Sequence, residues 1–302
     1  MDSKIISTYL NYCETHKRLS THTIRAYKND LLQFYNSNYN NVESYIEFLT
    51  KSNIKSNTLR RKIASLKVFY NYLKFQDIID ENPFNQLRFQ FRKEKILPKT
   101  IPYDILKSVY SYSEQKVIYS KSKYQKQKAE RNLLIISLLL STGIRISELC
   151  HIHLKDINFS NRTLHIIGKG KKERILFLGD QTTFSLLKTY TNKYCVRPND
   201  YLFTGQNPLK ALSEQSVRLI LKKLVKKNNL SITITPHMFR HSFATMLLDK
   251  DVDIRYIQQI LGHSSISVTQ IYTHVSQSKQ KEILTLCNPI TSIHSQPQKS
   301  DN

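Results

Sequence analysis

This chain of 302 residues contains few cysteines, few glycines and few acidic residues. The four cysteines, Cys13, Cys150, Cys195 and Cys287, form no CxxC pair. This spacing argues against a disulfide framework and against a cysteine-based zinc site, and it is typical of proteins of the reducing cytosol. We therefore expect a cytoplasmic protein.

Long apolar segments are also missing. The longest apolar run extends from Leu133 to Leu140 and is interrupted by Ser137, whereas a membrane span needs about 20 such residues. The first residues lack the apolar stretch of a secretory signal. The run predicts a buried helix, and we expect no membrane association.

Positive charge is abundant, because 46 Lys and Arg outnumber 23 Asp and Glu. This excess predicts a polyanionic partner, since phosphates release counterions when they bind Lys and Arg. A basic protein of the membrane surface would carry a similar charge. Residues 1–98 hold 16 Lys and Arg against 9 Asp and Glu, and the remainder holds 30 against 14, so both parts are expected to contact the same polyanion. With 13 Phe and 18 Tyr the chain can fill a core, and its length suggests about two domains.

The six glycines all lie beyond residue 142. Because glycine marks turns and close backbone approaches, the first part is expected to be helical and the second to hold strands and the site. Ile24, Tyr27, Leu31 and Phe34 recur at helical spacing after Ser20. A second helix is expected to be capped by Ser56 or Asn57.

The later part predicts a mixed domain. The buried helix ends at Gly143, and short strands are expected at 155–159, 163–167 and 174–178. The polar stretch 111–131 predicts either a long helix pair or a mobile insertion. We expect a helical domain at 1–90, a linker with two prolines at 91–102, an α+β domain at 103–288 and a polar tail at 289–302.

One string predicts an anion site. Thr235 is a good N-cap and Pro236 suits the first helical position, so His237 and Arg240 fall in the first turns of a helix. A helix N-terminus favours anions, phosphate above all. The alternative is an exposed helix with an incidental His and Arg. His237 and His241 have metal-ligand spacing, but no HExxH glutamate or acidic cluster accompanies them, so no metal is expected.

Other candidates are individually weak. Arg145 and Glu148 are three apart, so the carboxylate could orient the guanidinium, or the two could form a surface ion pair. Residues 168–172 form a basic hairpin tip that lacks the GxxxxGK[ST] of nucleotide-binding loops, so ATP and GTP are not expected. Gly262 should end a helix and hold His263 at a turn, and Tyr272 falls one turn into the next helix. Each could also be an ordinary turn or half-buried residue.

Taken together and in order, these strings resemble the tyrosine recombinases, or phage integrase family, which includes the Xer-type enzymes. The resemblance rests on STGIRISEL at 141–149, IIGKGKKER at 166–174, HMFRHSFAT at 237–245 and LGHSSISVTQIYTHV at 261–275, and more loosely on LSTHTIRAYKNDLLQF at 19–34. It implies a mainly helical protein with a small sheet. An N-terminal SAM-like core-binding domain and an α+β catalytic domain would form a C-shaped clamp on DNA.

The resemblance also implies a role for each site residue. Arg145 and Arg240 would bind the scissile phosphate, His263 would donate a further hydrogen bond to it, and Glu148 would buttress Arg145. Tyr272 would be the nucleophile that forms a 3′-phosphotyrosyl link, His237 would transfer a proton or support the phosphate, and Lys169 would protonate the departing 5′ oxygen. The chemistry is consistent, because two guanidiniums and imidazole donors can stabilise the transition state without a metal.

The implied partner is double-stranded DNA with a specific recombination site, bound by a tetramer on two duplexes, alone or with a second recombinase. No cofactor is implied. Further basic residues are expected to contact DNA: Arg25, Lys28, Arg60, Arg61, Lys171, Lys172, Arg218 and Lys222. Two alternatives share much of the pattern, namely a type IB topoisomerase-like DNA relaxing enzyme and a non-catalytic DNA-binding protein derived from a recombinase.

Overall fold

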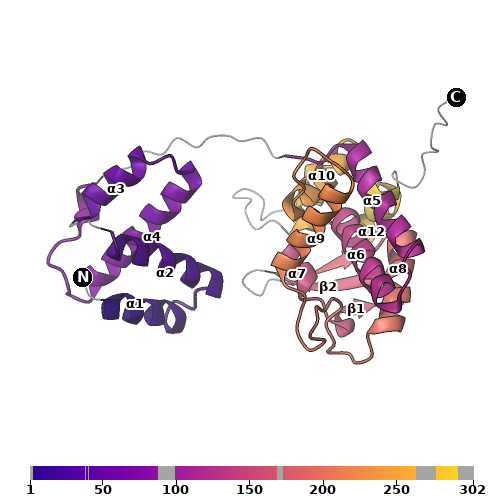
Figure 1. Cartoon of the computed structure of the whole chain (residues 1–302), viewed down its shortest axis with the longest axis horizontal. Coiled ribbons are helices and arrows are strands. Elements are labelled where there is room, and N and C mark those ends of the chain that lie inside the picture. The colour runs from indigo at the N-terminus through magenta and orange to yellow at the C-terminus, as the bar shows by residue number, and fades with distance from the viewer. Residues whose placement is uncertain are drawn as a thin grey trace. The chain divides into compact units, whose positions relative to one another are not determined.

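The computed structural model describes residues 3–37, 39, 41–87, 99–168, 173–262 and 277–291, of which 277–280 are described by their backbone alone. The chain divides into two compact units, Met1–Ile96 and Leu97–Asn302, and each is described by itself (Figure 1). Much of the expected linker at 91–102 lies outside the described residues.

The described residues of the first unit form helices joined by turns, and no strand. Its helices are α1 (Ser3–Thr15), α2 (Thr21–Tyr35), α3 (Val42–Lys51) and α4 (Ser56–Phe75), followed by the short 3-10 helix η1 (Pro83–Asn85). The helix expected after Ser20 is α2, and Ser20 caps it by accepting from the Thr23 N–H. The second predicted cap is wrong: α4 begins at Ser56 itself, after Lys55, which caps nothing with its side chain. The apolar faces meet in one core that includes Tyr9, Leu31 and Phe69.

The second unit is built around the buried second half of one long helix. Helices α5 (Tyr103–Ile118) and α6 (Lys123–Thr142) form the helix pair that was one of two predictions for the polar stretch 111–131. Ser122 starts α6 by accepting from the Gln125 N–H. From Leu133 to Thr142 every residue of α6 is buried, because α5, α8 (Gln181–Tyr194) and α10 (Pro236–Leu248) pack around it (Figure 1).

A small antiparallel sheet in the order β1-β2-β3 lies beside these helices. Strand β2 (Thr163–Ile167) pairs with β1 (Ile157–Asn158) and with β3 (Glu173–Phe177), in the register Leu164 opposite Leu176. The first strand is shorter than predicted, because Leu154 and Lys155 donate their backbone N–H groups to Asp200 and Pro198. Residues 154–156 form the 3-10 helix η2 instead.

The remaining helices complete this unit. They are α7 (Ile146–Cys150), α9 (Glu214–Lys227), α11 (Ile254–Leu261) and α12 (Gln277–Leu286). Helix α12 packs against its own chain: a Cβ at Gly179 would lie 2.1 Å from the Leu284 carbonyl oxygen. Asn288 and Ile290 are buried, so the packed chain continues into the segment expected to be a polar tail. Among the helices that the structure describes, none is long and apolar enough to cross a membrane.

Candidate active site

Two glycines at helix ends bring three helices close together. Gly143 ends α6 and Gly262 ends α11, and both adopt the left-handed conformation, with φ of 60° and 64°. A Cβ at Gly143 would lie 2.6 Å from Cδ1 of Phe243 on α10 and 2.7 Å from Cδ2 of Leu261 on α11. The predicted helix ends are therefore confirmed, and they lie at one point of the second unit.

Arg240 connects these two helix ends. Its guanidinium donates from Nη1 to the Gly143 carbonyl at 2.8 Å and from Nη2 to the Leu261 carbonyl at 2.6 Å. The last carbonyls of a helix have no partner within the helix and form the negative end of its dipole. A buried guanidinium, only 6% exposed, is therefore held where backbone oxygens favour it.

Arg145 is held beside Arg240 by the next carbonyl along the chain. Its Nη2 donates to the Gly262 carbonyl at 2.9 Å, and its Nη1 donates to Oε1 of Glu148 at 2.9 Å. A guanidinium has five N–H hydrogens, so these two bonds leave others for a ligand. Since the Arg145 side chain is 32% exposed, it is the open member of the arginine pair.

Glu148 is not part of a surface ion pair. Its side chain is 3% exposed, and both carboxylate oxygens accept two hydrogen bonds. Arg145 donates two of these four bonds, one from its side chain and one from its backbone N–H (3.0 Å). Arg174 donates the other two from its two terminal nitrogens, at 2.9 and 2.8 Å. The surface alternative for the Arg145–Glu148 pair is therefore wrong.

Arg174 is a site residue that the sequence reasoning missed. It lies in β3, where the alternation of side chains places it on the same face as Leu176, which is buried. An arginine on the inward face of a strand needs a buried partner, and that was the available signal. The partner, Glu148, is 26 residues away in the sequence.

The electrostatics of the cluster favour an anion. Burial, together with the nearby positive charge of Arg145, lowers the pKa of Arg240 to about 10. Burial alone would raise the pKa of Glu148, but the bonds and charges of Arg174 and Arg145 outweigh it and hold that pKa below its usual value. Three guanidiniums surround one carboxylate, so uncompensated positive charge remains for a ligand.

His237 lies one turn before Arg240 on α10, where Thr235 caps the helix as predicted. It is exposed, whereas Arg240 points inward, so the two residues have different environments. Burial, together with the charges of His237 and Arg240, lowers the pKa of His241. No group of metal-ligating side chains occurs among the described residues.

The other predicted catalytic residues cannot be placed. Lys169, His263 and Tyr272 lie outside the described residues, as do Lys171 and Lys172. The described chain stops at Gly168, directly before Lys169, resumes at Glu173, and stops again at Gly262, directly before His263.

A basic hollow of about 430 Å³ lies between α2 and α4 of the first unit. Two of the predicted DNA contacts, Arg25 and Arg61, line it. Asp30 is buried at its edge, where it accepts from Arg61 and from the Ser65 hydroxyl at 2.9 Å. The full lining is His22, Arg25, Ala26, Asn29, Asp30, Gln33, Thr58, Arg61 and Lys62.

The remaining predicted contacts are dispersed. Lys28 is exposed on α2, and Arg60 is half-buried on α4. In the second unit Arg218 pairs with Glu214 at 2.7 Å, one turn before the exposed Lys222 on α9. None of these four lines the basic hollow.

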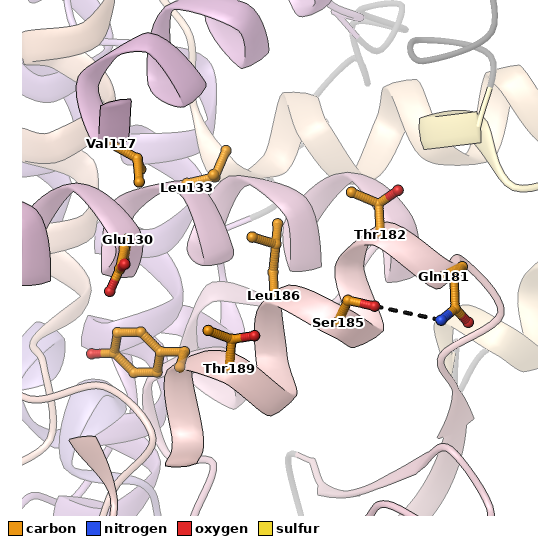
Figure 2. Close-up of a pocket in the computed structure, with 9 residues that line it drawn as sticks. Val117, Glu130, Leu133, Gln181, Thr182, Ser185, Leu186 and Thr189 are labelled. Carbon is orange, nitrogen blue, oxygen red and sulfur yellow. Dashed lines mark hydrogen bonds between the residues drawn. The ribbon is translucent and has the colours of Figure 1, made fainter. Parts of the chain in front are cut away.

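A second hollow, of about 380 Å³, lies between α5, α6 and α8 (Figure 2). Leu133, Leu186 and Val117 give it an apolar wall, and the carboxylate of Glu130 at its rim accepts from Lys193 and the Tyr194 hydroxyl, both at 2.8 Å. Leu133 and the end of α6 are separated by about 14 Å of helix, so this hollow is separate from the arginine cluster.

Comparison with known families gives two matches that follow one another along the chain. Residues 110–279 match the phage integrase family, and residues 6–77 match the phage integrase N-terminal SAM-like domain. A tyrosine recombinase from Agathobacter rectalis is 46% identical and covers 96% of this chain and 97% of its own length. Tyrosine recombinase XerC from Staphylococcus epidermidis is 33% identical over 95% of this chain and 97% of its own.

Solved structures share the fold. The XerH site-specific recombinase in a pre-cleavage complex with its difH substrate has a TM-score of 0.65 and 23% identity, covering 95% of this chain and 85% of its own. The Tn1549 transposon integrase in complex with transposon right end DNA has a TM-score of 0.64 and 22% identity, covering 93% and 99%. At these identities the likeness concerns the fold alone.

Proposed function

Since the chain belongs to the phage integrase family and is a tyrosine recombinase, an enzyme that cleaves and rejoins DNA, we propose that it recombines specific DNA sites through a bond between phosphate and Tyr272. The single observation that carries this site assignment is the arginine pair. Arg145 and Arg240 are bonded to successive carbonyls, those of Gly262 and Leu261, so their guanidiniums are held side by side.

The arginine pair binds the scissile phosphate. In the transition state negative charge gathers on the non-bridging oxygens, where fixed guanidinium donors stabilise it more than they stabilise the ground state. Both arginines are already held by backbone and carboxylate oxygens, so little side-chain freedom is lost when they bind the phosphate.

Cleavage then exchanges one phosphoester for another. The phenolic oxygen of Tyr272 bonds to phosphorus, the bond to the 5′ oxygen breaks, and Lys169 donates a proton to that oxygen. His237 accepts the phenol proton or supports the phosphate, and His263 donates a hydrogen bond to it. Rejoining reverses these steps with the 5′ hydroxyl of another strand. No ATP is needed, because the phosphotyrosyl bond conserves the energy of the bond that was broken.

DNA binding uses basic residues of both units. In the first unit these are Arg25, Lys28, Arg60 and Arg61. In the second unit Lys171, Lys172, Arg218 and Lys222 contact phosphates beyond the cleavage point. XerH and the Tn1549 integrase are bound to DNA substrates in their structures, which supports this partner.

The assembly that we propose is a tetramer on two duplexes, alone or with a second recombinase. It acts in the cytoplasm, in integration or excision of mobile DNA or in the resolution of chromosome or plasmid dimers.

The test is capture of the covalent intermediate. The protein is incubated with a nicked duplex that carries a candidate site, so that the cleaved strand end diffuses away and the adduct accumulates. We expect an adduct that survives boiling in detergent and is absent in Tyr272→Phe. Tyr256→Phe, a change to a half-buried tyrosine of α11, is the matched control and should retain the adduct. An adduct that persists in Tyr272→Phe would contradict the assignment of the nucleophile.

A second measurement separates this function from DNA relaxation. A supercoiled plasmid without the site should remain supercoiled, because strand cleavage requires the assembled complex on its own site. Relaxation at the same rate with and without the site would favour the topoisomerase-like enzyme instead.

A further inference from the structure

We propose that Arg174 is a positioning residue for strand cleavage, which acts through Glu148 and Gly262 to hold the guanidinium of Arg145 against the scissile phosphate. The inference rests on the proposed function, and it adds a residue of β3 to the machinery of that site. Arg174 supports the partners of Arg145 rather than the phosphate itself.

Arg174 supplies half of the hydrogen bonds that hold Glu148. The carboxylate accepts four bonds, and Arg174 donates two of them in a bidentate arrangement at 2.9 and 2.8 Å. Such bidentate pairs fix orientation as well as distance. Since Glu148 is 3% exposed, water cannot replace the bonds of Arg174, and without them the carboxylate would be held from the side of Arg145 alone.

The contact with Gly262 carries the second step. A Cβ at Gly262 would lie 3.0 Å from Cδ and 3.3 Å from Nε of Arg174, so the arginine stem packs directly against this turn. The same turn presents the carbonyl that accepts from Nη2 of Arg145. Arg174 therefore contacts both residues that hold the Arg145 guanidinium. These are Glu148, which accepts from Nη1 of Arg145, and Gly262, which accepts from Nη2.

Charge carries the third step. Glu148 faces Arg145 at the start of α7, Arg174 on β3 and the nearby charge of Arg240 on α10. Arg174 compensates part of the negative charge of Glu148, and its side chain is 14% exposed against 32% for Arg145, so the charge of the more open arginine remains available to the phosphate. Without Arg174, the carboxylate would compensate Arg145 instead.

The experiment compares Arg174→Ala and Arg174→Lys with the wild-type chain in single-turnover cleavage of the nicked duplex and in DNA binding. We expect Arg174→Ala to slow cleavage about 100-fold, the loss typical of a misplaced catalytic group, while the Kd for DNA changes little. Arg174→Lys keeps the positive charge but loses the bidentate hydrogen bonds to Glu148, so it should recover part of the cleavage rate. Arg197→Ala, which removes an exposed arginine paired with Asp200, is the control and should cleave normally.

The pH profile provides a readout that a merely structural role would not move. Arg174 is the chief group that lowers the pKa of Glu148, so in Arg174→Ala that pKa should rise. Glu148 would then become protonated at a higher pH, and cleavage should begin to fall at a higher pH than in the wild-type chain. A double-mutant cycle with Glu148→Gln should be strongly non-additive, because Arg174 acts through Glu148.

Several results would overturn the inference. Wild-type cleavage by Arg174→Ala with an unchanged pH profile would remove any role for Arg174, and equal losses in binding and cleavage would make it a DNA contact. Independent, additive losses with Glu148→Gln would also contradict it. If Arg174→Ala does not fold, Arg174→Lys and Arg174→Gln carry the same comparison. Failure of the wild-type chain to form an adduct would instead count against the proposed function.

Discussion

At the scale of single residues, the second unit buries charge in order to organise it. Arg240 and Glu148 are nearly inaccessible to water, yet every bond that holds them ends on a backbone carbonyl, a backbone N–H or an opposite charge. Burying charge is costly unless it is paired in this way. Burying these charges costs the fold some stability, but it holds the guanidiniums in position before a phosphate binds.

The first prediction concerns Glu148→Gln. Removing the carboxylate leaves Arg145 and Arg174 without their shared counter-charge, and we expect a loss of about 3 kcal/mol in the free energy of unfolding at pH 7. Because the pKa of Glu148 is lowered in the folded chain, its contribution is present above its unfolded pKa of 4.5 and is lost as the pH falls through the folded value. Urea denaturation at pH 7 and at acid pH measures this.

The control for that prediction is Glu47→Gln, which removes an exposed i,i+4 pair with Lys51 on α3. Its free energy of unfolding should remain close to that of the wild-type chain. Equal destabilisation by the two substitutions, or an effect of Glu148→Gln that does not shrink toward acid pH, would contradict the role given to the buried carboxylate.

The second prediction concerns inorganic phosphate as a probe of the arginine pair. Phosphate that binds the folded state but not the unfolded state should raise the Tm of the chain. At a phosphate concentration of a hundred times the Kd, the stabilisation should be about 2.7 kcal/mol. The rise should be largely lost in Arg145→Ala, because Arg145 is the more exposed member of the arginine pair.

For the phosphate measurement, Arg197→Ala is the matched variant and sodium chloride of equal ionic strength is the matched salt. A rise in Tm that is the same in Arg145→Ala and Arg197→Ala would show that phosphate acts on the whole basic surface rather than at this cluster.

At the scale of elements, the site is built where helices stop. Helices α6 and α11 both end in left-handed glycines, and their last carbonyls become the anchors for Arg240 and Arg145. Helix α10, which begins after its cap Thr235, brings Arg240 and Phe243 to these helix ends. The position of the arginines is therefore a consequence of where two helices end and a third packs against them.

The third prediction concerns Gly143→Ala. The added methyl group would meet Phe243 and Leu261 at less than 3 Å, and alanine disfavours the φ of 60°, so we expect a loss of about 2 kcal/mol in the free energy of unfolding. Gly205→Ala is the control, because nothing lies within 4 Å of a Cβ at Gly205. Chemical denaturation of both variants measures the difference, and similar values for the two would contradict the close approach of α10 and α11.

At the scale of the whole molecule, both units are basic, and the first unit contains the basic hollow between α2 and α4. Asp30 lies buried there, bonded to Arg61 and to the Ser65 hydroxyl and paired with Lys62 at 3.7 Å. The carboxylate holds two cations of α4 beside the residues of α2. This arrangement suits a surface that meets phosphates with side chains already in position.

The fourth prediction concerns Arg61→Ala and the salt dependence of DNA binding. If Arg61 contacts one phosphate, its loss should weaken binding and reduce the slope of log K against log salt by about 0.9. Lys51→Ala, which removes an exposed cation on α3, should leave the slope unchanged. Titrations at several salt concentrations measure both variants, and equal slopes would mean that Arg61 does not contact DNA.

Local sequence patterns fix where several helices of this protein begin and end. The helix after Ser20, the cap at Thr235 and the helix ends at Gly143 and Gly262 were predicted, because each depends on side-chain spacing, hydrogen bonds or φ values within a few residues. The failed cap before α4 marks the limit of such rules, since Lys55 precedes that helix without a side-chain cap.

The contacts of the functional side chains depend instead on long-range packing. Arg174 and Glu148 are 26 residues apart, and Arg145 and Gly262 are 117 apart, so no periodicity or cap rule connects them. These pairs exist because α6, α10, α11 and β3 pack into one core, which brings buried charges and free helix-end carbonyls within bonding distance. Long-range packing of this kind depends on the shape of the whole unit, and local sequence patterns do not encode it.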